Sequence, residues 1–184
     1  MSRALIVAGA PASGKTIYAT ALSQKLDYLV FDLDDQLSDF IEKGRTRLDE
    51  VGMEKFLAEI RDARYRDLVE RGMHALTEGK SVILVAPFSK ETSSIEIWGE
   101  LSGAFLEFGV QLKLIWVRIS REKIRERMLA RAEIRDQEKV SSEAAFDEYM
   151  QSTNFQFPVV PYVEVRGDLP FESQLDVLSR FAML

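Results

Sequence analysis

The sequence predicts an α/β protein of three layers, with a parallel sheet between two layers of helices. Short aliphatic runs alternate with longer segments of helical periodicity, which is the pattern of right-handed βαβ units. The runs are apolar throughout, as expected for strands that helices cover on both faces. The 184 residues are 46% hydrophobic and 29% charged, which suits one domain with an ordinary core. We therefore expect residues 1–184 to form a single domain.

The five expected strands are short apolar runs, and a feature that ends a strand follows each of the first three. A loop of Gly, Pro, Ala and Ser follows the first run, acidic residues follow the second, and Pro87 follows the third. In chain order the expected strands lie at residues 5–7, 28–31, 81–85, 112–119 and 162–165.

Helical segments are expected to fill the intervals between these strands. Ser120 is a suitable N-cap for a basic helix after the fourth strand. Gly72 predicts a break or bend in the long charged segment before the third strand, and the polar residues 136–145 are expected to be mobile. In chain order the expected helices lie at residues 15–26, 36–41, 49–77, 94–108, from 121 onward, and at 171–184.

The composition excludes several classes of protein. There are no cysteines, which rules out disulfide frameworks and thiolate chemistry, and His74 is the only histidine. The net charge of −6 disfavours a protein that coats nucleic acid. No apolar run approaches the roughly 18 residues of a membrane span. The apolar beginning of the chain resembles a short signal peptide, but the motif that follows explains it better, so we expect a cytoplasmic protein without membrane contact.

That motif is a complete phosphate-binding loop, G-x-x-x-x-G-K-[ST], between an apolar strand and a helix. Its backbone N–H groups point at phosphate oxygens, its lysine reaches the β- and γ-phosphates, and its hydroxyl binds Mg²⁺. An ordinary glycine-rich turn with a solvated lysine is the alternative. We expect ATP and Mg²⁺ as cofactors, bound by Gly9, Ala10, Pro11, Ala12, Ser13, Gly14, Lys15 and Thr16.

The carboxylates of the site are expected at the end of the second strand, because neither the third nor the fourth strand ends in an acidic residue. Residues two apart in an extended segment face the same way, so Asp32 and Asp34 can both face the phosphate-binding loop while Asp35 points away. Asp32 suits the binding of Mg²⁺ through water, and Asp34 suits the orientation or deprotonation of an attacking hydroxyl. The alternative is that Asp34 or Asp35 caps the next helix.

A basic helix supplies the remaining charges. Lys123, Arg127, Arg131 and Arg135 recur every four residues, and Arg127 and Arg131 have no carboxylate three or four residues away on their own helix. An anionic partner such as the phosphates of a nucleotide explains them, and the alternative is pairing with acids elsewhere in the fold. We expect Lys15, Arg127 and Arg131 to stabilise the charge of a transferred phosphoryl group.

Together these parts resemble the P-loop kinases of small molecules, the group of shikimate kinase, gluconate kinase, adenylate-kinase-like enzymes and zeta-toxin-like ATP-binding proteins. Residues 31–36 resemble the D-x-D strand end of the shikimate kinase branch, and residues 126–131 resemble the start of the arginine-bearing lid. The resemblance implies a kinase-type P-loop NTPase fold with strand order 2-3-1-4-5. It also implies a lid at about residues 127–142 that closes over ATP, and contact of Asp34 with the substrate hydroxyl.

Two further points follow from the resemblance. Gly167, after the last strand, stands where related kinases place the loop against adenine. Shikimate kinases have a glycine triplet after the third strand, whereas residues 86–90 of this chain read Ala-Pro-Phe-Ser-Lys, so shikimate itself is not expected as the substrate.

The sequence thus favours an ATP- and Mg²⁺-dependent kinase of a small hydroxylated molecule, as a monomer or a homodimer. A nucleotide-binding regulator or toxin–antitoxin component with little activity is the second hypothesis. The third, a polynucleotide 5′-hydroxyl kinase, is disfavoured because the chain outside the basic helix is acidic. Candidates to bind an anionic acceptor are Arg45, Arg47, Arg61, Arg64 and Lys90.

Overall fold

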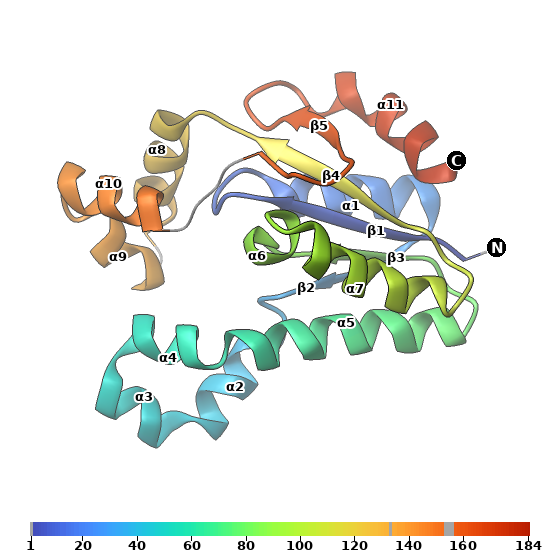
Figure 1. Cartoon of the computed structure of the whole chain (residues 1–184). Coiled ribbons are helices and arrows are strands. Elements are labelled where there is room, and N and C mark those ends of the chain that lie inside the picture. Colours follow the sequence, from blue (N-terminus) through green and yellow to red (C-terminus); the bar gives the residue numbers. More distant parts are fainter. Residues whose placement is uncertain (1, 133, 153–156) are drawn as a thin grey trace.

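Figure 1 shows the computed structural model of the chain, which describes residues 2–132, 134–152 and 157–184, with only the backbone at 134, 135 and 152. The described residues contain one sheet of five parallel strands in the order β2-β3-β1-β4-β5. This order confirms the predicted α/β fold class. In chain order the strands are β1 (Ala4–Gly9), β2 (Leu29–Asp32), β3 (Val82–Val85), β4 (Leu112–Arg118) and β5 (Val163–Arg166).

Helices connect the strands and cover both faces of the sheet (Figure 1). No helix within the described residues is long and apolar enough to cross a membrane. In chain order the helices are α1 (Lys15–Leu26), α2 (Leu37–Lys43), α3 (Arg45–Val51), α4 (Met53–Glu59), α5 (Arg61–Thr77), α6 (Ser89–Thr92), α7 (Ile95–Leu106), α8 (Arg121–Arg131), α9 (Ile134–Val140), α10 (Glu143–Ser152) and α11 (Glu172–Met183).

Alternate residues of β1 belong to the two faces of the sheet. Ile6 lies in a buried cluster with side chains of α5 and α7, such as Leu68. Val7 lies in a second buried cluster with side chains of α1 and α11, such as Leu22. Because both faces are covered, every residue of β1 is buried and the three predicted layers are present.

The carboxyl ends of the parallel strands lie along one edge of the sheet, where the loops after β1, β2 and β5 meet. Gly9 at the end of β1 pairs with Val117 of β4, and Asp32 at the end of β2 pairs with Val85 of β3. Ligands of open α/β sheets bind beyond this edge. The topology therefore brings the phosphate-binding loop and the acidic strand end to the same side of the molecule.

The helical region between β2 and β3 differs from the prediction. Two helices are expected there, at residues 36–41 and 49–77, whereas the chain forms α2, α3, α4 and α5. Successive helices are separated near Gly44, Gly52 and Ile60. Gly52 has a φ of 81°, a left-handed conformation that glycine adopts without strain.

The break predicted as one possibility at Gly72 is wrong, because α5 is continuous from Arg61 to Thr77. Gly72 faces the sheet, and a Cβ atom there would lie 2.7 Å from Cδ2 of Leu84. The glycine therefore permits close packing of α5 on β3 and does not interrupt the helix.

The predicted mobile segment 136–145 is largely helical, because it contributes to α9 and α10. Val140 and Phe146 are buried and form a small apolar cluster with Ile124 and Met128 of α8. This burial offsets the polar composition on which the expectation rested. The cluster joins α8, α9 and α10 in the region that the resemblance identifies as a lid.

We expect Gly72→Val to lower the free energy of unfolding by about 1–3 kcal/mol, because the added atoms overpack a buried contact. Gly99→Val is the matched control: Gly99 also lies within a helix, and no atom lies within 4 Å of a Cβ built there. The control should change the free energy by less than about 0.5 kcal/mol. Urea unfolding measures both, and equal effects of the two variants would contradict the packing role of Gly72.

Candidate active site

The loop between β1 and α1 follows a path that its glycines make possible. Gly9 has a φ of 142°, and a Cβ atom there would lie 2.4 Å from the carbonyl oxygen of Val117. Gly14 directly precedes α1, and no side chain caps the helix. The N–H groups of its first turn, at the positive end of a 12-residue helix, are therefore oriented to bind an anion.

Lys15 and Thr16 begin α1 and connect the loop to the acidic strand end. The ammonium group of Lys15 donates to the carbonyl oxygens of Gly9 at 3.1 Å and Ala10 at 2.8 Å, so it lies over the loop. The hydroxyl of Thr16 donates to Oδ2 of Asp32 at 3.1 Å. The loop and the end of β2 thus meet at a hydroxyl and a carboxylate.

The carboxylate of Asp32 is partly buried between these elements. Its Oδ1 accepts a hydrogen bond from the N–H of Asp34 at 3.1 Å. Burial raises the pKa of Asp32, and the hydrogen bonds from the Asp34 N–H and the Thr16 hydroxyl oppose this shift in part. A nearby cation would favour the charged form of this carboxylate.

Asp34 is held by an arginine of α5. Nη2 of Arg64 donates to Oδ1 of Asp34 at 2.9 Å and to the carbonyl oxygen of Leu33 at 3.1 Å. The side chain of Arg64 is 9% exposed, whereas that of Asp34 is 43% exposed. A buried arginine therefore orients a carboxylate that solvent and a ligand can reach.

Asp35 has a structural role, and among the hydrogen bonds of the described residues neither Asp34 nor Asp35 caps the next helix. Oδ2 of Asp35 accepts the N–H of Asp32 at 2.8 Å and lies 3.5 Å from Nη1 of Arg71. The next helix, α2, begins after Gln36 without a side-chain cap. Asp35 thus stabilises the turn that presents Asp32.

A second arginine of α5 lies beside Arg64. Nη2 of Arg61 donates to both carboxylate oxygens of Glu91 at 3.1 Å, and its guanidinium lies 4.0 Å from the ring centre of Tyr65. The hydroxyl of Tyr65 accepts the N–H of Phe88 at 3.2 Å, and burial raises its pKa. Arg61 and Tyr65 are therefore paired within this polar wall, whereas the buried Nε of Arg64 has no hydrogen-bond partner among the described residues.

Of the five basic residues considered for an anionic acceptor, Arg61 and Arg64 line the cavity of the site. The other three pair with carboxylates: Arg45 with Asp49 on its own helix, Arg47 with Glu50 and with Glu59 of the next helix, and Lys90 of α6 with Asp62 of α5. The sequence analysis missed Tyr65, which also lines the cavity, although positions 61, 64 and 65 lie on one face of a helix.

Arg127 of α8 connects two loops. Its Nη1 donates to the carbonyl oxygens of Ala12 at 3.2 Å and Ser13 at 3.3 Å, and its Nη2 donates to that of Gly167 at 2.8 Å. Among the described residues no carboxylate lies within ion-pair distance of Arg127, and all three hydrogen-bond acceptors are neutral. The guanidinium therefore forms no ion pair within this part of the chain, although it acts at longer range on Asp168, whose pKa is lowered by Arg166 and to a smaller extent by Arg127.

Arg131, one helical turn later, has an acidic partner. Its Nε lies 2.6 Å from Oδ2 of Asp136, which belongs to α9 and is buried. Nζ of Lys139 lies 3.8 Å from the other oxygen of that carboxylate. The alternative of pairing with an acid elsewhere in the fold therefore holds for Arg131. The side chain of Arg135 lies outside the described residues.

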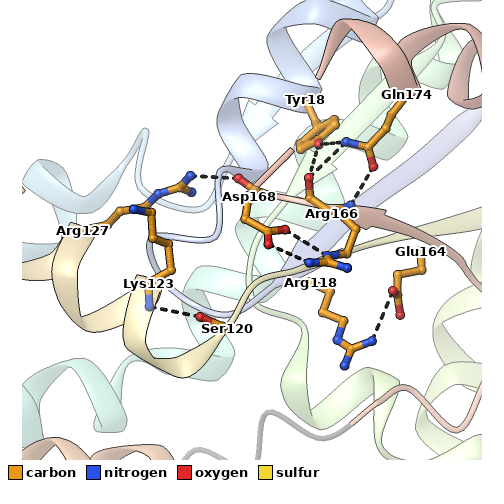
Figure 2. A network of polar contacts seen from close by, with 10 residues as sticks. Tyr18, Arg118, Ser120, Lys123, Arg127, Glu164, Arg166, Asp168 and Gln174 are labelled. Atoms are coloured by element: carbon orange, nitrogen blue, oxygen red, sulfur yellow. Dashed lines mark hydrogen bonds and ion pairs between the residues drawn. The ribbon is translucent and has the colours of Figure 1, made fainter. Parts of the chain in front are cut away.

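Gly167, the residue expected near adenine, lies against the phosphate-binding loop. Its N–H donates to the carbonyl oxygen of Arg118 at 2.7 Å, and a Cβ atom there would lie 2.2 Å from the carbonyl oxygen of Ser13. Figure 2 shows this turn between β5 and α11, with Arg127 on one side and Tyr18 and Gln174 on the other.

One cavity of about 1170 Å³ brings most of the predicted site residues together. All four residues predicted as catalytic and both predicted metal ligands line it, namely Lys15, Thr16, Asp32, Asp34, Arg127 and Arg131. Pro11, Ala12 and Gly14 also line it, whereas Gly9, Ala10, Ser13, Gly167 and Asp35 do not. The loop, the acidic strand end and the basic helix thus share one cavity.

The sequence profile of a protein family described as an AAA domain (AAA_33) matches residues 5–155. A search of curated proteins finds no significant match.

Solved structures described as kinases share the fold over almost the whole chain. A candidate kinase from Chloroflexus aurantiacus is 17% identical, with a TM-score of 0.70 over 99% of this chain and 96% of that one. A gluconokinase from Sinorhizobium meliloti is 16% identical, with a TM-score of 0.60 over 99% and 94%. An APS kinase from Mycobacterium tuberculosis, in complex with AMPPNP and APS, is 15% identical, with a TM-score of 0.61 over 100% and 98%. These likenesses confirm the predicted resemblance in fold.

We expect Arg131→Ala to lower the free energy of unfolding by about 2–3 kcal/mol, because it leaves the buried carboxylate of Asp136 without its closest cation. Adding Asp136→Asn should restore part of this loss. Lys123→Ala is the control, because Lys123 pairs with Glu126 on the exposed surface, and it should cost less than about 0.5 kcal/mol. Thermal or urea unfolding measures all three, and an Arg131→Ala variant as stable as the control would contradict the buried pair.

Proposed function

The chain belongs to the AAA domain family that matches residues 5–155, and we propose that it is a kinase that transfers the γ-phosphoryl group of ATP to a hydroxyl of a small molecule. The observation that carries the proposal is that Lys15, Asp34 and Arg127, from three separate elements, line one cavity of about 1170 Å³. Single small-molecule sites measure roughly 300–1,000 Å³, so this volume suits two substrates side by side. The proposed kinase domain spans residues 1–184, with a lid at about 127–142.

The loop from Gly9 to Thr16 is proposed to bind the phosphates of ATP. Its backbone N–H groups and the N-terminus of α1 supply the donors, and Lys15 can exchange its carbonyl partners for phosphate oxygens. Arg127 and Arg131 are proposed to stabilise the charge of the transferred group from the opposite wall.

Thr16 and Asp32 fit Mg²⁺, because a hydroxyl and a carboxylate are hard oxygen ligands. Within the described ranges no group of three or more His, Cys, Asp or Glu could hold a metal ion. Mg²⁺ bound with substrate phosphates needs fewer protein ligands, since it keeps several waters. When bound, the ion neutralises charge on the β- and γ-phosphates. Thr16 would bind it directly and Asp32 through water.

Asp34 is proposed to act on the acceptor. Its carboxylate orients the acceptor hydroxyl and receives the proton as that oxygen attacks the γ-phosphorus. The bond from the γ-phosphorus to the β–γ bridging oxygen breaks, and ADP leaves. Arg64, which donates to Oδ1 of Asp34, holds the carboxylate in position, and its own side chain is almost fully buried.

A screen for acceptor-dependent release of ADP tests this function. Sugars, sugar acids, nucleosides and aminoglycosides cover the small hydroxylated acceptors, and a short oligonucleotide with a 5′-hydroxyl covers the polynucleotide alternative. Transfer to a small molecule supports the proposal. Binding of ATP without transfer to any acceptor would favour a nucleotide-binding regulator or a toxin–antitoxin component.

We expect Mg-ATP at a hundredfold excess over its dissociation constant to stabilise the fold by about 2.7 kcal/mol. For a chain of this length the melting temperature should rise by roughly 5–10 °C. Lys15→Ala should remove most of this rise, because the lysine contacts the β- and γ-phosphates. Differential scanning fluorimetry measures both, and a wild-type melting curve that Mg-ATP does not move would contradict the proposed function.

We expect Asp34→Asn to reduce the rate of acceptor phosphorylation by about 10²–10⁴-fold, because an amide cannot accept the proton of the hydroxyl. The affinity for ATP and the background hydrolysis should stay close to wild type. Asp39→Asn, at an exposed position of α2 outside the cavity, is the matched control and should leave the rate unchanged. A normal rate in Asp34→Asn, measured on the acceptor from the screen, would remove Asp34 from the mechanism.

A further inference from the structure

Two side chains hold the turn after β5 from the side opposite Arg127. Tyr18 belongs to α1, which begins at the phosphate-binding loop, and Gln174 belongs to α11, outside the part of the chain that matches the family. Both contact the backbone of Arg166, the last residue of β5. Figure 2 shows the three residues together.

The side-chain amide of Gln174 meets both backbone polar groups of Arg166. Its Oε1 accepts the N–H of Arg166 at 2.7 Å, and its Nε2 donates to the carbonyl oxygen of the same residue at 3.0 Å. This two-point contact resembles the pairing of a neighbouring strand. It fixes the position and the orientation of the peptide groups that lead into the turn.

The hydroxyl of Tyr18 completes a closed set of hydrogen bonds. It donates to the carbonyl oxygen of Arg166 at 2.8 Å and accepts from Nε2 of Gln174 at 2.7 Å. Tyr18 is buried, and burial raises its pKa, so the hydroxyl is a donor at neutral pH. Removal of the Gln174 amide takes away the partner of the Arg166 N–H, and removal of the Tyr18 hydroxyl leaves the carbonyl oxygen of Arg166 with one of these two side-chain donors.

The next residue, Gly167, links the backbone of Arg166 to the candidate site. It has little room to move, because its backbone packs against the carbonyl oxygen of Ser13, and its own carbonyl oxygen accepts from Arg127 at 2.8 Å. A shift of Gly167 toward the phosphate-binding loop would cause a clash, and a shift away from it would break the bond to Arg127.

We propose that Tyr18 and Gln174 are positioning residues for the base of the bound nucleotide. They hold residues 166–168 at a fixed distance from the phosphate-binding loop, where Gly167 accepts a hydrogen bond from Arg127, a residue that lines the cavity. This inference rests on the proposed function, because it requires that ATP binds at the loop. Tyr18 meets the phosphate-binding loop through its backbone, because its N–H donates to the carbonyl oxygen of Gly14 at 3.3 Å. The side-chain hydrogen bonds of the pair go instead to Arg166 and Pro170. The two side chains therefore govern the part of the affinity that depends on the base.

The test compares two ligands on the full chain by calorimetry. Mg-ATP carries the base and the phosphates, whereas Mg-tripolyphosphate carries the phosphates alone. Gln174→Glu keeps the size of the side chain but places a carboxylate oxygen against the carbonyl oxygen of Arg166. Tyr18→Phe removes only the hydroxyl. Gln24→Glu, at an exposed position of α1, is the matched control for the added charge.

We expect Gln174→Glu to weaken binding of Mg-ATP about tenfold, and Tyr18→Phe several-fold, in line with the loss of one or two hydrogen bonds. Binding of Mg-tripolyphosphate should stay within about twofold in both variants, and the control should bind both ligands as the wild type does. A merely structural role would weaken both ligands alike and would overturn the inference.

The outcomes separate this inference from the proposed function. If the wild-type chain binds Mg-ATP but the ratio of the two affinities is unchanged in both variants, the positioning role alone is wrong. If the wild-type chain binds neither ligand, both the positioning role and the proposed function are wrong. Circular dichroism and thermal unfolding without ligand show whether each variant folds, and Tyr18→Phe keeps the aromatic packing should Gln174→Glu unfold.

Discussion

The contact on which the candidate site depends most is that of the Arg127 guanidinium with three carbonyl oxygens. Two of them, from Ala12 and Ser13, belong to the loop after β1, and the third, from Gly167, belongs to the turn after β5. These loops are far apart in the sequence, and parallel strands bring them only to the same edge of the sheet. A planar cation with five donors can hold both at once. All three acceptors are neutral carbonyl groups. The positive charge of Arg127, which joins the two loops, would therefore also attract a phosphate group.

Arg131 shows how one helix can use two similar residues differently. It follows Arg127 by one turn, and neither has an acid within reach on its own helix, yet Arg131 pairs with the buried Asp136. That pair, with the apolar cluster around Phe146, fastens α9 to α8. Arg131 therefore has a structural partner as well as a place in the cavity, and a loss of activity in an Arg131 variant has to be separated from a loss of the packing of α9 on α8.

The features that could be predicted from the sequence are those that depend on residues close together in the chain. The phosphate-binding loop is a contiguous motif, and Asp32 and Asp34 are close in the sequence. Both line the cavity, although residues 33–36 form a turn and not the extended segment on which the prediction relied. The pairing of Arg131 with Asp136 crosses the end of a helix, which helical spacing does not cover. Tyr18 and Gln174 are 156 residues apart, so only the folded topology joins them. Gly72 was misread because glycine in a helix can serve packing as well as bending, and α9 and α10 were missed because a few buried residues outweigh a polar composition.

The most direct test of the account is hydrogen exchange of the full chain with and without Mg²⁺ and AMPPNP, an ATP analogue with a non-hydrolysable γ-phosphate bond. A nucleotide held between the two loops that Arg127 joins should slow amide exchange in residues 9–16 and also in residues 166–168. Slowed exchange in the first segment alone would mean that the turn after β5 takes no part in binding. The same rates with and without the nucleotide in both segments would contradict the assignment of this cavity as a nucleotide site.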